Sequence, residues 1–393
     1  MKVLFINSVY KYGSTGRIIE TLCNYLDSNG DSYKVLYGRF NQNREHYINN
    51  NINIVTDVTK SLIFNNHGFN SERNTYKIIS QIKDYTPDII HIHNLHGFYC
   101  NIEILLEFLK QYNKPIIFTL HDCWSFTGFC AHYESNNCNN FKKGCHNCMF
   151  KNTYPYKFFL NKKRTVINLK KKLDLFNSLD NITFIAPSLW MYNQLNNSML
   201  NGYFKVINNG IDLNNFYVED NYDYEEEIIL GVANKWTKKK GLEDFVKLSE
   251  MLDKKYKIIL VGLDEKQIKK MPSNIIGIRK TQSIHELRKL YNSAKVFVNL
   301  TYEDTFPTVN IEALACGTQV ITYNTGGSGE IIQECGYIVD KGDLNSVLKN
   351  IKLIKKNKTT ISNCQKRALK LYSSDCMLKD YYKLYNECIN NGE

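Results

Sequence analysis

Short runs of apolar, mostly β-branched residues recur along the chain, and amphipathic segments with a helical spacing follow several of them. Such unbroken runs predict strands of a parallel sheet, because strands covered by helices on both faces bury every side chain. The runs fall at 3–6, 88–93, 115–120, 182–186, 204–207, 228–234, 258–261, 296–300 and 319–323. The pattern therefore predicts an α/β protein.

Length, composition and charge limit the number of domains, the localisation and the partners that we expect. The chain has 393 residues, more than one hydrophobic core usually supports, so we expect two domains. A hydrophobic content of 43% excludes wholesale disorder. No run is long enough for a membrane span, and the apolar start at 1–6 is too short for a signal sequence, so we expect a cytoplasmic protein. The net charge of +11 favours acidic partners, namely nucleotide sugars, an anionic membrane surface or nucleic acid.

One stretch, 302–317, combines an acidic loop with a short helix and follows the strand expected at 296–300. Pro307 suits the first turn of that helix, because its missing N–H would have no partner there. The amides of Thr308 and Val309 would be unpaired at the helix start, which is a typical anion site. The residues alone leave two interpretations open: an anion site, or a solvated acidic loop before a core helix.

The same stretch resembles the E-x₇-E segment of family 4 retaining glycosyltransferases, which have the two-domain GT-B fold. In that family the second Glu binds the ribose of the nucleotide and the first reaches the donor sugar. Glu312 takes the second place in this chain, and Asp304, one methylene shorter, takes the first. The resemblance implies donor contacts from Glu303, Phe306, Pro307, Thr308 and Val309.

Two glycine-containing segments also resemble donor-binding loops of the family. In the segment 7–17, Gly13 and Gly16 would let backbone amides approach a diphosphate. A plain strand–turn–helix fits these residues equally well, because the full G-x-G-x-x-G pattern is absent. The segment 324–330 resembles the Gly-Gly-x-x-Glu loop, whose backbone packs near the donor. That loop contains Gly326, Gly327 and Glu330.

Histidines stand at the carboxyl ends of two predicted strands, where ligands of open α/β sheets collect. We expect His96 to contact the acceptor. His121 resembles the family histidine that approaches the outer hydroxyl of the donor sugar, and a hydrogen-bonded loop pair with Asp122 is the alternative. His91 and His93 share one face of a strand, and we interpret them as satisfied core histidines.

Two further motifs resemble the hinge and the diphosphate clamp of the family. Asn209 opens a tetrapeptide similar to the N-G-x-D turn at the hinge, and the acidic, Tyr- and Asn-rich stretch 213–227 is the expected linker. Lys240, followed by glycine, matches the Lys-Gly pair that clamps the donor diphosphate. Lys235 takes the place where Arg is usual, with a monodentate contact. A solvated lysine run is the alternative, which we favour for Lys238.

Cysteines cluster in the expected insertion 123–148. In a cytosolic protein they are thiols or metal ligands rather than disulfides. Cys145 and Cys148 have the spacing of half a zinc site, and Cys130 and Cys138 would complete a closed tetrahedron. Four reduced thiols are the alternative, although a long loop without a regular pattern needs something to order it. Similar Cys-rich insertions occur in relatives that build bacterial capsular and exopolysaccharides, including the colanic-acid type.

The segment 156–176 is typical of a basic amphipathic helix. Such a helix can lie on an anionic membrane, or it can pack on its own domain with a solvated basic face. We favour packing on the domain. The apolar face carries Phe159, Val166, Leu169, Leu173 and Phe176.

The motifs together predict the GT-B fold, α/β with two doubly wound Rossmann-like domains facing a central cleft. The expected acceptor-side domain spans 1–212 and includes the Cys-rich insertion. The expected nucleotide-sugar-binding domain spans 225–373, and a C-terminal helix at 374–393 crosses back to the first domain.

The resemblance implies a retaining, hexosyltransferase-type enzyme that moves a sugar from a nucleotide diphosphate sugar to a glycan or lipid-linked acceptor. The setting it implies is bacterial cell-surface polysaccharide synthesis, at the inner face of the plasma membrane. The expected catalytic residues are His121, Lys240, Asp304 and Glu312. Charge on the leaving diphosphate would be stabilised by Lys235, Lys240 and the helix-start amides. No D-x-D motif is present, so we expect no catalytic metal or other cofactor, and zinc only as a structural ion.

Two other functions stay open. A zinc-stabilised nucleic-acid-binding protein fits the charge and the cysteines, but the lysines are dispersed and no recognition module is present. A catalytically weak glycan-binding relative is suggested by Asp304 in place of the usual Glu.

Overall fold

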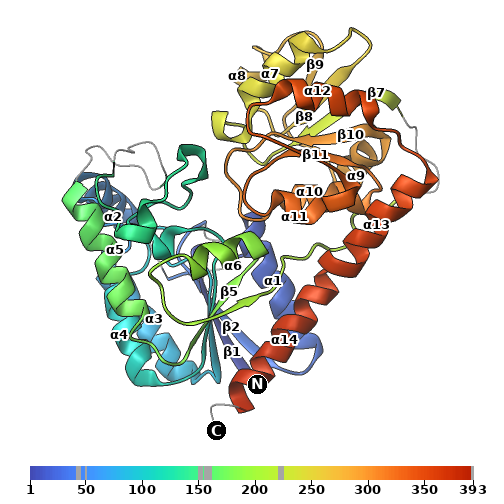
Figure 1. The fold of residues 1–393 in the computed structure, drawn as a ribbon. Helices are drawn as coiled ribbons and strands as arrows, with labels where there is room; N and C mark the ends of the chain where they lie inside the picture. The colour runs from blue at the N-terminus through green and yellow to red at the C-terminus, as the bar shows by residue number, and fades with distance from the viewer. Residues whose placement is uncertain (41–45, 49–50, 149–153, 155–161, 220–224, 391–393) are drawn as a thin grey trace. The chain divides into compact units, whose positions relative to one another are not determined.

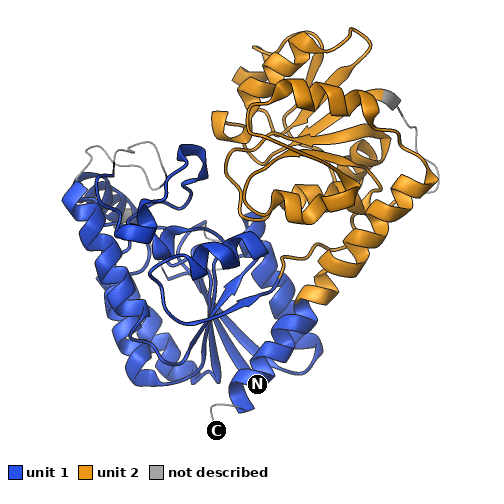
Figure 2. Cartoon of the chain, in the orientation of Figure 1, with its two compact units in different colours: residues 1–207, 378–393 blue, residues 208–377 orange. Residues whose placement is uncertain are grey.

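The computed structural model describes residues 1–40, 46–48, 51–148, 154, 162–219 and 225–390. The chain divides into two compact units, unit 1 with residues 1–207 and 378–393 and unit 2 with residues 208–377 (Figure 2). Each unit carries a six-stranded parallel sheet with helices on both of its faces (Figure 1). The α/β class predicted from the apolar runs is therefore confirmed.

Unit 1 has the strand order β2-β1-β3-β4-β5-β6. Its strands are β1 (Lys2–Asn7), β2 (Ser32–Tyr37), β3 (Ile89–Ile92), β4 (Ile116–Thr119), β5 (Ile182–Ala186) and β6 (Tyr203–Val206). Its helices are α1 (Gly13–Ser28), α2 (Asn51–Phe64), α3 (Glu72–Tyr85), α4 (Ile102–Tyr112), α5 (Lys162–Phe176) and α6 (Leu189–Asn196). Between β4 and α5 the described residues form 3₁₀ turns at Trp124–Phe126, Glu134–Asn136 and Asn140–Lys143. The central strands β3 and β4 are buried at every residue, as expected for strands covered on both faces.

Unit 2 has the strand order β12-β11-β10-β7-β8-β9. Its strands are β7 (Glu225–Val232), β8 (Lys257–Val261), β9 (Ile275–Ile278), β10 (Ala294–Asn299), β11 (Val320–Tyr323) and β12 (Gly336–Val339). Its helices are α7 (Leu242–Met251), α8 (Glu265–Ile268), α9 (Ile284–Ser293), α10 (Thr308–Ala315), α11 (Ser328–Ile332), α12 (Leu344–Leu353) and α13 (Lys358–Tyr372). Two 3₁₀ turns, η4 (Lys238–Lys240) and η5 (Gln333–Cys335), complete the unit.

Alternating residues of β7 supply two separate cores in unit 2. Ile228 and Leu230 belong to one apolar cluster with α10 and α13, and Ile229 belongs to the other with α7 and α12. Successive side chains of a strand point to opposite faces, so one strand serves both clusters. The carboxyl ends of β7 and β10 are thereby fixed from both sides.

The linker predicted over 213–227 is wrong at both of its described ends. β7 already begins at Glu225, and Phe216 packs against the apolar cluster of unit 2. Arg288 Nε donates to Glu219 at 2.8 Å. The described chain from 208 to 219 therefore belongs to unit 2, and Glu219 pairs with α9.

The C-terminal helix α14 (Ser374–Asn390) contacts strands of unit 1 with two tyrosine hydroxyls. The Tyr381 hydroxyl lies 2.8 Å from Thr119 Oγ1, and the Tyr385 hydroxyl lies 2.7 Å from His91 Nδ1. Residues 391–393 of the predicted helix lie outside the described residues. Among the helices that the structure describes, none has the length and apolar content to cross a membrane.

The basic helix predicted over 156–176 is described from Lys162 onward, as α5, and its earlier part, with Phe159, lies outside the described residues. Leu169, Leu173 and Phe176 belong to the apolar core of unit 1. This face of the helix packs on its own unit, as we favoured. Lys172 of this basic helix is buried.

Candidate active site

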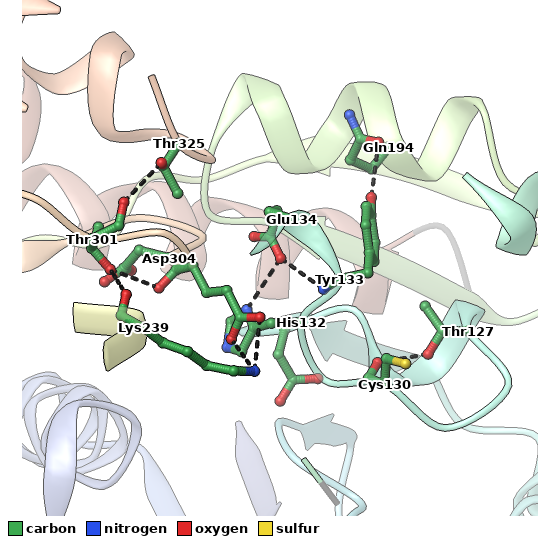
Figure 3. Close-up of polar contacts among 12 residues, drawn as sticks. Thr127, Cys130, His132, Tyr133, Glu134, Gln194, Lys239, Thr301, Asp304 and Thr325 are labelled. Atoms are coloured by element: carbon green, nitrogen blue, oxygen red, sulfur yellow. Dashed lines mark hydrogen bonds and ion pairs between the residues drawn. The ribbon is translucent and has the colours of Figure 1, made fainter. Parts of the chain in front are cut away.

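The acidic loop after β10 has a defined shape, because its backbone is tied down on both sides (Figure 3). Thr301 Oγ1 donates to the carbonyl of Glu303 at 3.0 Å, and Thr325 Oγ1 donates to the carbonyl of Thr301 at 2.8 Å. The amide of Phe306 donates to Asp304 Oδ1 at 3.3 Å. These bonds hold the loop between the end of β10 and the start of α10.

Two lysines of the turn η4 pair with the two carboxylates of this loop. Lys239 Nζ contacts both carboxylate oxygens of the buried Glu303 at 2.8 Å. Lys240 Nζ lies 2.7 Å from Asp304 Oδ2. Sequence reasoning missed Lys239, because a lysine run gives no sign of which member turns inward. The structure brings Lys240 and Asp304 together, although they are 64 positions apart.

A glycine fixes Lys240 close to the end of β10. Gly241 has a left-handed φ of +79°, and a Cβ there would come within 2.2 Å of the Leu300 carbonyl oxygen. Only glycine accepts both the conformation and this approach. The glycine of the Lys-Gly pair therefore positions the lysine before it.

The start of α10 offers backbone amides to a ligand. Pro307 occupies the N-cap position and supplies no side-chain cap, and Thr308 and Val309 are half-buried. Amides at an uncapped helix start attract anions, because their N–H groups lack intrahelical partners. Phe306 is buried against the ring of Tyr372, with ring centroids 5.6 Å apart.

Glu312 is half-buried within α10, and its carboxylate is oriented by a neighbour. Tyr291 of α9 donates its hydroxyl to Glu312 Oε2 at 2.8 Å. Tyr291 is fully buried, and burial together with Glu312 raises the pKa of its phenol well above the ordinary value. The tyrosine therefore stays a hydrogen-bond donor. Its role was not predictable from sequence, because it lies in a different helix.

The glycine-rich loop after β11 packs directly on the acidic loop. The amide of Gly327 donates to the carbonyl of Thr305 at 3.1 Å, and a Cβ on Gly326 would lie 1.6 Å from the carbonyl oxygen of Asp304. The carbonyl of Glu330 accepts from Arg367 at 2.7 Å. The two loops therefore form one structural block.

We expect Gly326→Ala to lower the free energy of unfolding by several kcal/mol, on the order of a large core mutation. The added methyl would overlap the Asp304 carbonyl, in addition to the strain of a left-handed φ of +52°. Gly342→Ala is the matched control, since its φ is +83° but the nearest atom to its Cβ is the Tyr302 hydroxyl at 3.5 Å. Urea unfolding should show a loss of roughly 1–2 kcal/mol for the control. Equal losses would contradict close packing of the two loops.

In unit 1, the glycines of the first loop lie at the start of α1. Gly13 is its first residue, with a φ of +65° and open space around its Cβ position. A Cβ on Gly16 would come within 3.1 Å of the Lys11 amide nitrogen. The helix start has no side-chain cap, so its first amides are available to a ligand.

Buried histidines form a hydrogen-bonded cluster at the carboxyl ends of β3 and β4. His93 Nδ1 lies 2.8 Å from His121 Nε2, and the two rings stack with centroids 5.1 Å apart. His91 bonds to Thr119 at 2.9 Å and to Tyr385. His91 and His93 are fully buried, as predicted for core histidines, but His93 Nε2 has no hydrogen-bond partner among the described residues. Burial lowers the pKa of all three histidines, that of His121 to about 4.

His96 pairs with Asp122 at 2.6 Å and is largely buried. Burial alone would raise the Asp122 pKa, but the contacts with His96, His132 and the Trp124 amide outweigh it and lower the pKa to about 2. This carboxylate is therefore ionised at neutral pH. The loop pair weighed as an alternative does form, but with His96 rather than His121.

Acidification should destabilise the protein through His121. The unfolded chain takes up its proton near pH 6.5, whereas the folded chain resists it to about pH 4. Between these values the unfolded state binds more protons, so stability is full above pH 6.5 and is lost as the pH falls. We expect His121 to contribute roughly 2 kcal/mol of this loss between pH 7 and pH 5.

Urea titrations at both pH values test this contribution. His121→Gln should flatten the pH dependence, and His285→Gln, whose side chain is 55% exposed, should leave it unchanged. The same pH dependence in wild type and His121→Gln would contradict the buried, neutral state of His121.

Two further predicted contact residues, Lys235 and Asn209, lie in unit 2. Lys235 is exposed, and Asn209 is buried in unit 2 with Oδ1 lacking a hydrogen-bond partner among the described residues. Lys238 is exposed and pairs with Glu243 at 3.1 Å, as expected for a solvated lysine.

The four cysteines Cys130, Cys138, Cys145 and Cys148 line a single cavity of about 20 Å³ in unit 1. Among the described residues, no three His, Cys, Asp or Glu side chains are arranged as the ligands of a metal ion. None of these four cysteines is in a disulfide.

Two family models match the chain. The model described as Glycosyltransferase Family 4 matches residues 15–215, and the model described as Glycosyl transferases group 1 matches residues 215–371. A putative colanic acid biosynthesis glycosyl transferase of Escherichia coli is 24% identical, over 82% of each chain. A capsular polysaccharide biosynthesis glycosyltransferase of Staphylococcus aureus is 25% identical, over 47% of this chain and 54% of the relative.

Solved structures share the fold. Sucrose-phosphate synthase from Thermosynechococcus elongatus has a TM-score of 0.73 at 17% identity, with 99% of each chain covered. Anabaena HepE in complex with UDP has a TM-score of 0.66 at 13% identity, with 98% of this chain and 100% of that chain covered. The fold predicted as GT-B is therefore confirmed by both its sheets and its structural relatives.

Proposed function

The chain belongs to glycosyltransferase family 4, and from this we propose that it transfers a hexose from a nucleotide diphosphate sugar to a hydroxyl with retention at the anomeric carbon. We further propose that the acceptor is a glycan or lipid-linked intermediate of bacterial surface polysaccharide synthesis. The similarity to glycosyltransferases of colanic acid and capsular polysaccharide biosynthesis supports this setting.

The observation that carries the proposal is the pair of Lys240 and Asp304 at 2.7 Å, beside the uncapped start of α10. A nucleotide diphosphate sugar needs positive charge and amides for its phosphates, and acceptors for its sugar hydroxyls. This part of unit 2 supplies all three. When a donor binds, the Lys240 ammonium would contact the diphosphate and the Asp304 carboxylate would contact a hydroxyl.

The chemistry follows from these placements. As the bond to the sugar breaks, negative charge grows on the diphosphate, and groups already aimed at it stabilise the transition state. Lys240 and the amides of Thr308 and Val309 would supply this stabilisation. Glu312, oriented by Tyr291, would accept hydrogen bonds from the ribose. No step in this scheme calls for a divalent metal, and we propose that none is needed.

A thermal-shift screen of nucleotide sugars, followed by transfer assays without added metal, tests the proposal. A donor that binds only the folded state raises the melting temperature. NMR of the product should then show the anomeric configuration of the donor. A nucleotide that binds without any transfer would favour the weak glycan-binding relative, and tighter binding of an oligonucleotide at moderate salt would favour the nucleic-acid-binding protein.

A further inference from the structure

The segment after β4 in unit 1 brings together four cysteines that the proposed reaction does not use. We name the space that they share the thiol cavity. Its volume of about 20 Å³ is enough for one water molecule or one ion. It is lined by Cys130, Cys138, Cys145 and Cys148, together with Phe129, Tyr133 and Phe141.

The backbone between Cys145 and Cys148 turns tightly, so that both side chains reach the cavity. Gly144, Cys145 and Asn147 all have left-handed φ values, of +91°, +57° and +55°. Left-handed conformation is uncommon for residues other than glycine, and two of them within one short turn are held by the surrounding structure. The amide of Cys145 donates to the Asn140 carbonyl at 2.7 Å, which fixes the start of the turn.

A sulfur atom in this cluster is already a hydrogen-bond acceptor. The Gly128 amide donates to Cys145 Sγ at 3.2 Å. This contact holds the Cys145 side chain beside Gly128, which lines the same cavity.

A buried lysine lies next to the cavity. Lys172 is 1% exposed, donates to the Trp124 carbonyl, and lies over the Trp124 ring with Nζ 4.1 Å from its centroid. Burial lowers the pKa of Lys172 to about 7, and the neighbouring Cys145 and Cys130 act in the opposite direction. Negative charge at these two cysteines would therefore stabilise the charged form of this lysine.

We propose that Cys130, Cys138, Cys145 and Cys148 bind one zinc ion as a closed tetrathiolate site. Four thiols lose four protons to one Zn²⁺, which leaves a site of charge −2 next to Lys172. The sulfur atoms do not converge in the structure. All four cysteines nevertheless line the thiol cavity, and rotation about each Cα–Cβ bond moves Sγ without moving the backbone.

The ion would stabilise a segment that has little other regular structure. Between β4 and α5 the described residues form only short 3₁₀ turns. Such turns contribute few backbone hydrogen bonds, and a closed zinc site contributes folding energy directly. The site is structural and belongs to unit 1, whereas Lys240, Asp304 and Glu312 belong to unit 2, so the proposal does not depend on the proposed reaction.

Metal analysis of the full chain, purified under reducing conditions without chelators, tests the site. We expect about one zinc per chain. Cys138→Ser and Cys148→Ser should each lose it, and Cys376→Ser should retain it. Cys376 is the matched control, because it is half-buried like Cys138 but lies in α14.

Cobalt substitution keeps the proposal testable if a variant does not fold. Co²⁺ in wild type should give thiolate charge-transfer bands and the intense visible bands of a tetrahedral site. Wild type without zinc, Cys138→Ser with full zinc, or cobalt spectra without thiolate bands would each overturn the proposal. A disulfide between any two of these cysteines, detected by mass spectrometry of the native protein, would overturn it as well.

Discussion

Lys240→Ala will lower kcat of sugar transfer by about 10²–10³-fold, the usual effect of removing one group that stabilises developing charge. Lys240 is held by Gly241 at the end of β10 and lies 2.7 Å from Asp304, so its ammonium is in place before a donor binds. Loss of this charge raises the barrier for departure of the diphosphate. The side chain is 38% exposed, so folding should be little affected. Initial rates with saturating donor measure the effect, and urea unfolding checks the fold.

Lys238→Ala is the control for this experiment. Lys238 lies on the same 3₁₀ turn, but its side chain is 80% exposed and pairs with Glu243. If the effect of Lys240 depends on position, Lys238→Ala should retain nearly full activity. Equal losses in both variants would reduce the role of Lys240 to general electrostatic attraction of the donor. Full activity of Lys240→Ala would remove it from the mechanism.

The sequence predicted the central strands of both sheets and missed three edge strands, β2, β9 and β12. The central strands are continuous apolar runs, because helices cover them on both faces. The apolar runs of these three strands are short or broken: Ser32 and Lys34 interrupt β2, Gly277 interrupts β9, and β12 begins with Gly336. They therefore give a weaker signal than the unbroken apolar runs of the central strands.

The candidate site was predictable where a motif fixes the residue and not where a partner lies far away in the chain. Lys240, Asp304 and Glu312 follow from the resemblance. The pairing of Lys239 with Glu303, and of Tyr291 with Glu312, depends on how separate elements pack. The linker error has the same cause, because nothing in a polar stretch reveals that Arg288 of a later helix holds Glu219.

Neutralising Glu312 and neutralising Asp304 should impair different functions of the site, namely nucleotide binding and sugar transfer. Glu312→Gln should weaken binding of the free nucleoside diphosphate by about 10- to 100-fold, the cost of a hydrogen bond to a charged group. Glutamine can still accept the Tyr291 hydrogen bond, so the orientation of the side chain is kept. Asp304→Asn should leave diphosphate binding unchanged or slightly stronger, because Lys240 loses the partner that competes with the phosphates.

The two variants should also differ in the rate of sugar transfer. Asp304→Asn should lower the rate of transfer, since the proposed partner of Asp304 is a sugar hydroxyl that the free diphosphate lacks. Asp304→Glu, which restores the usual family residue, should keep activity or change the preferred sugar. Calorimetry with the free diphosphate measures nucleotide binding, and initial rates with the full donor measure transfer. If Asp304→Asn weakened the diphosphate as much as Glu312→Gln did, both carboxylates would act on the nucleotide, and the assignment of Asp304 to the sugar would be wrong.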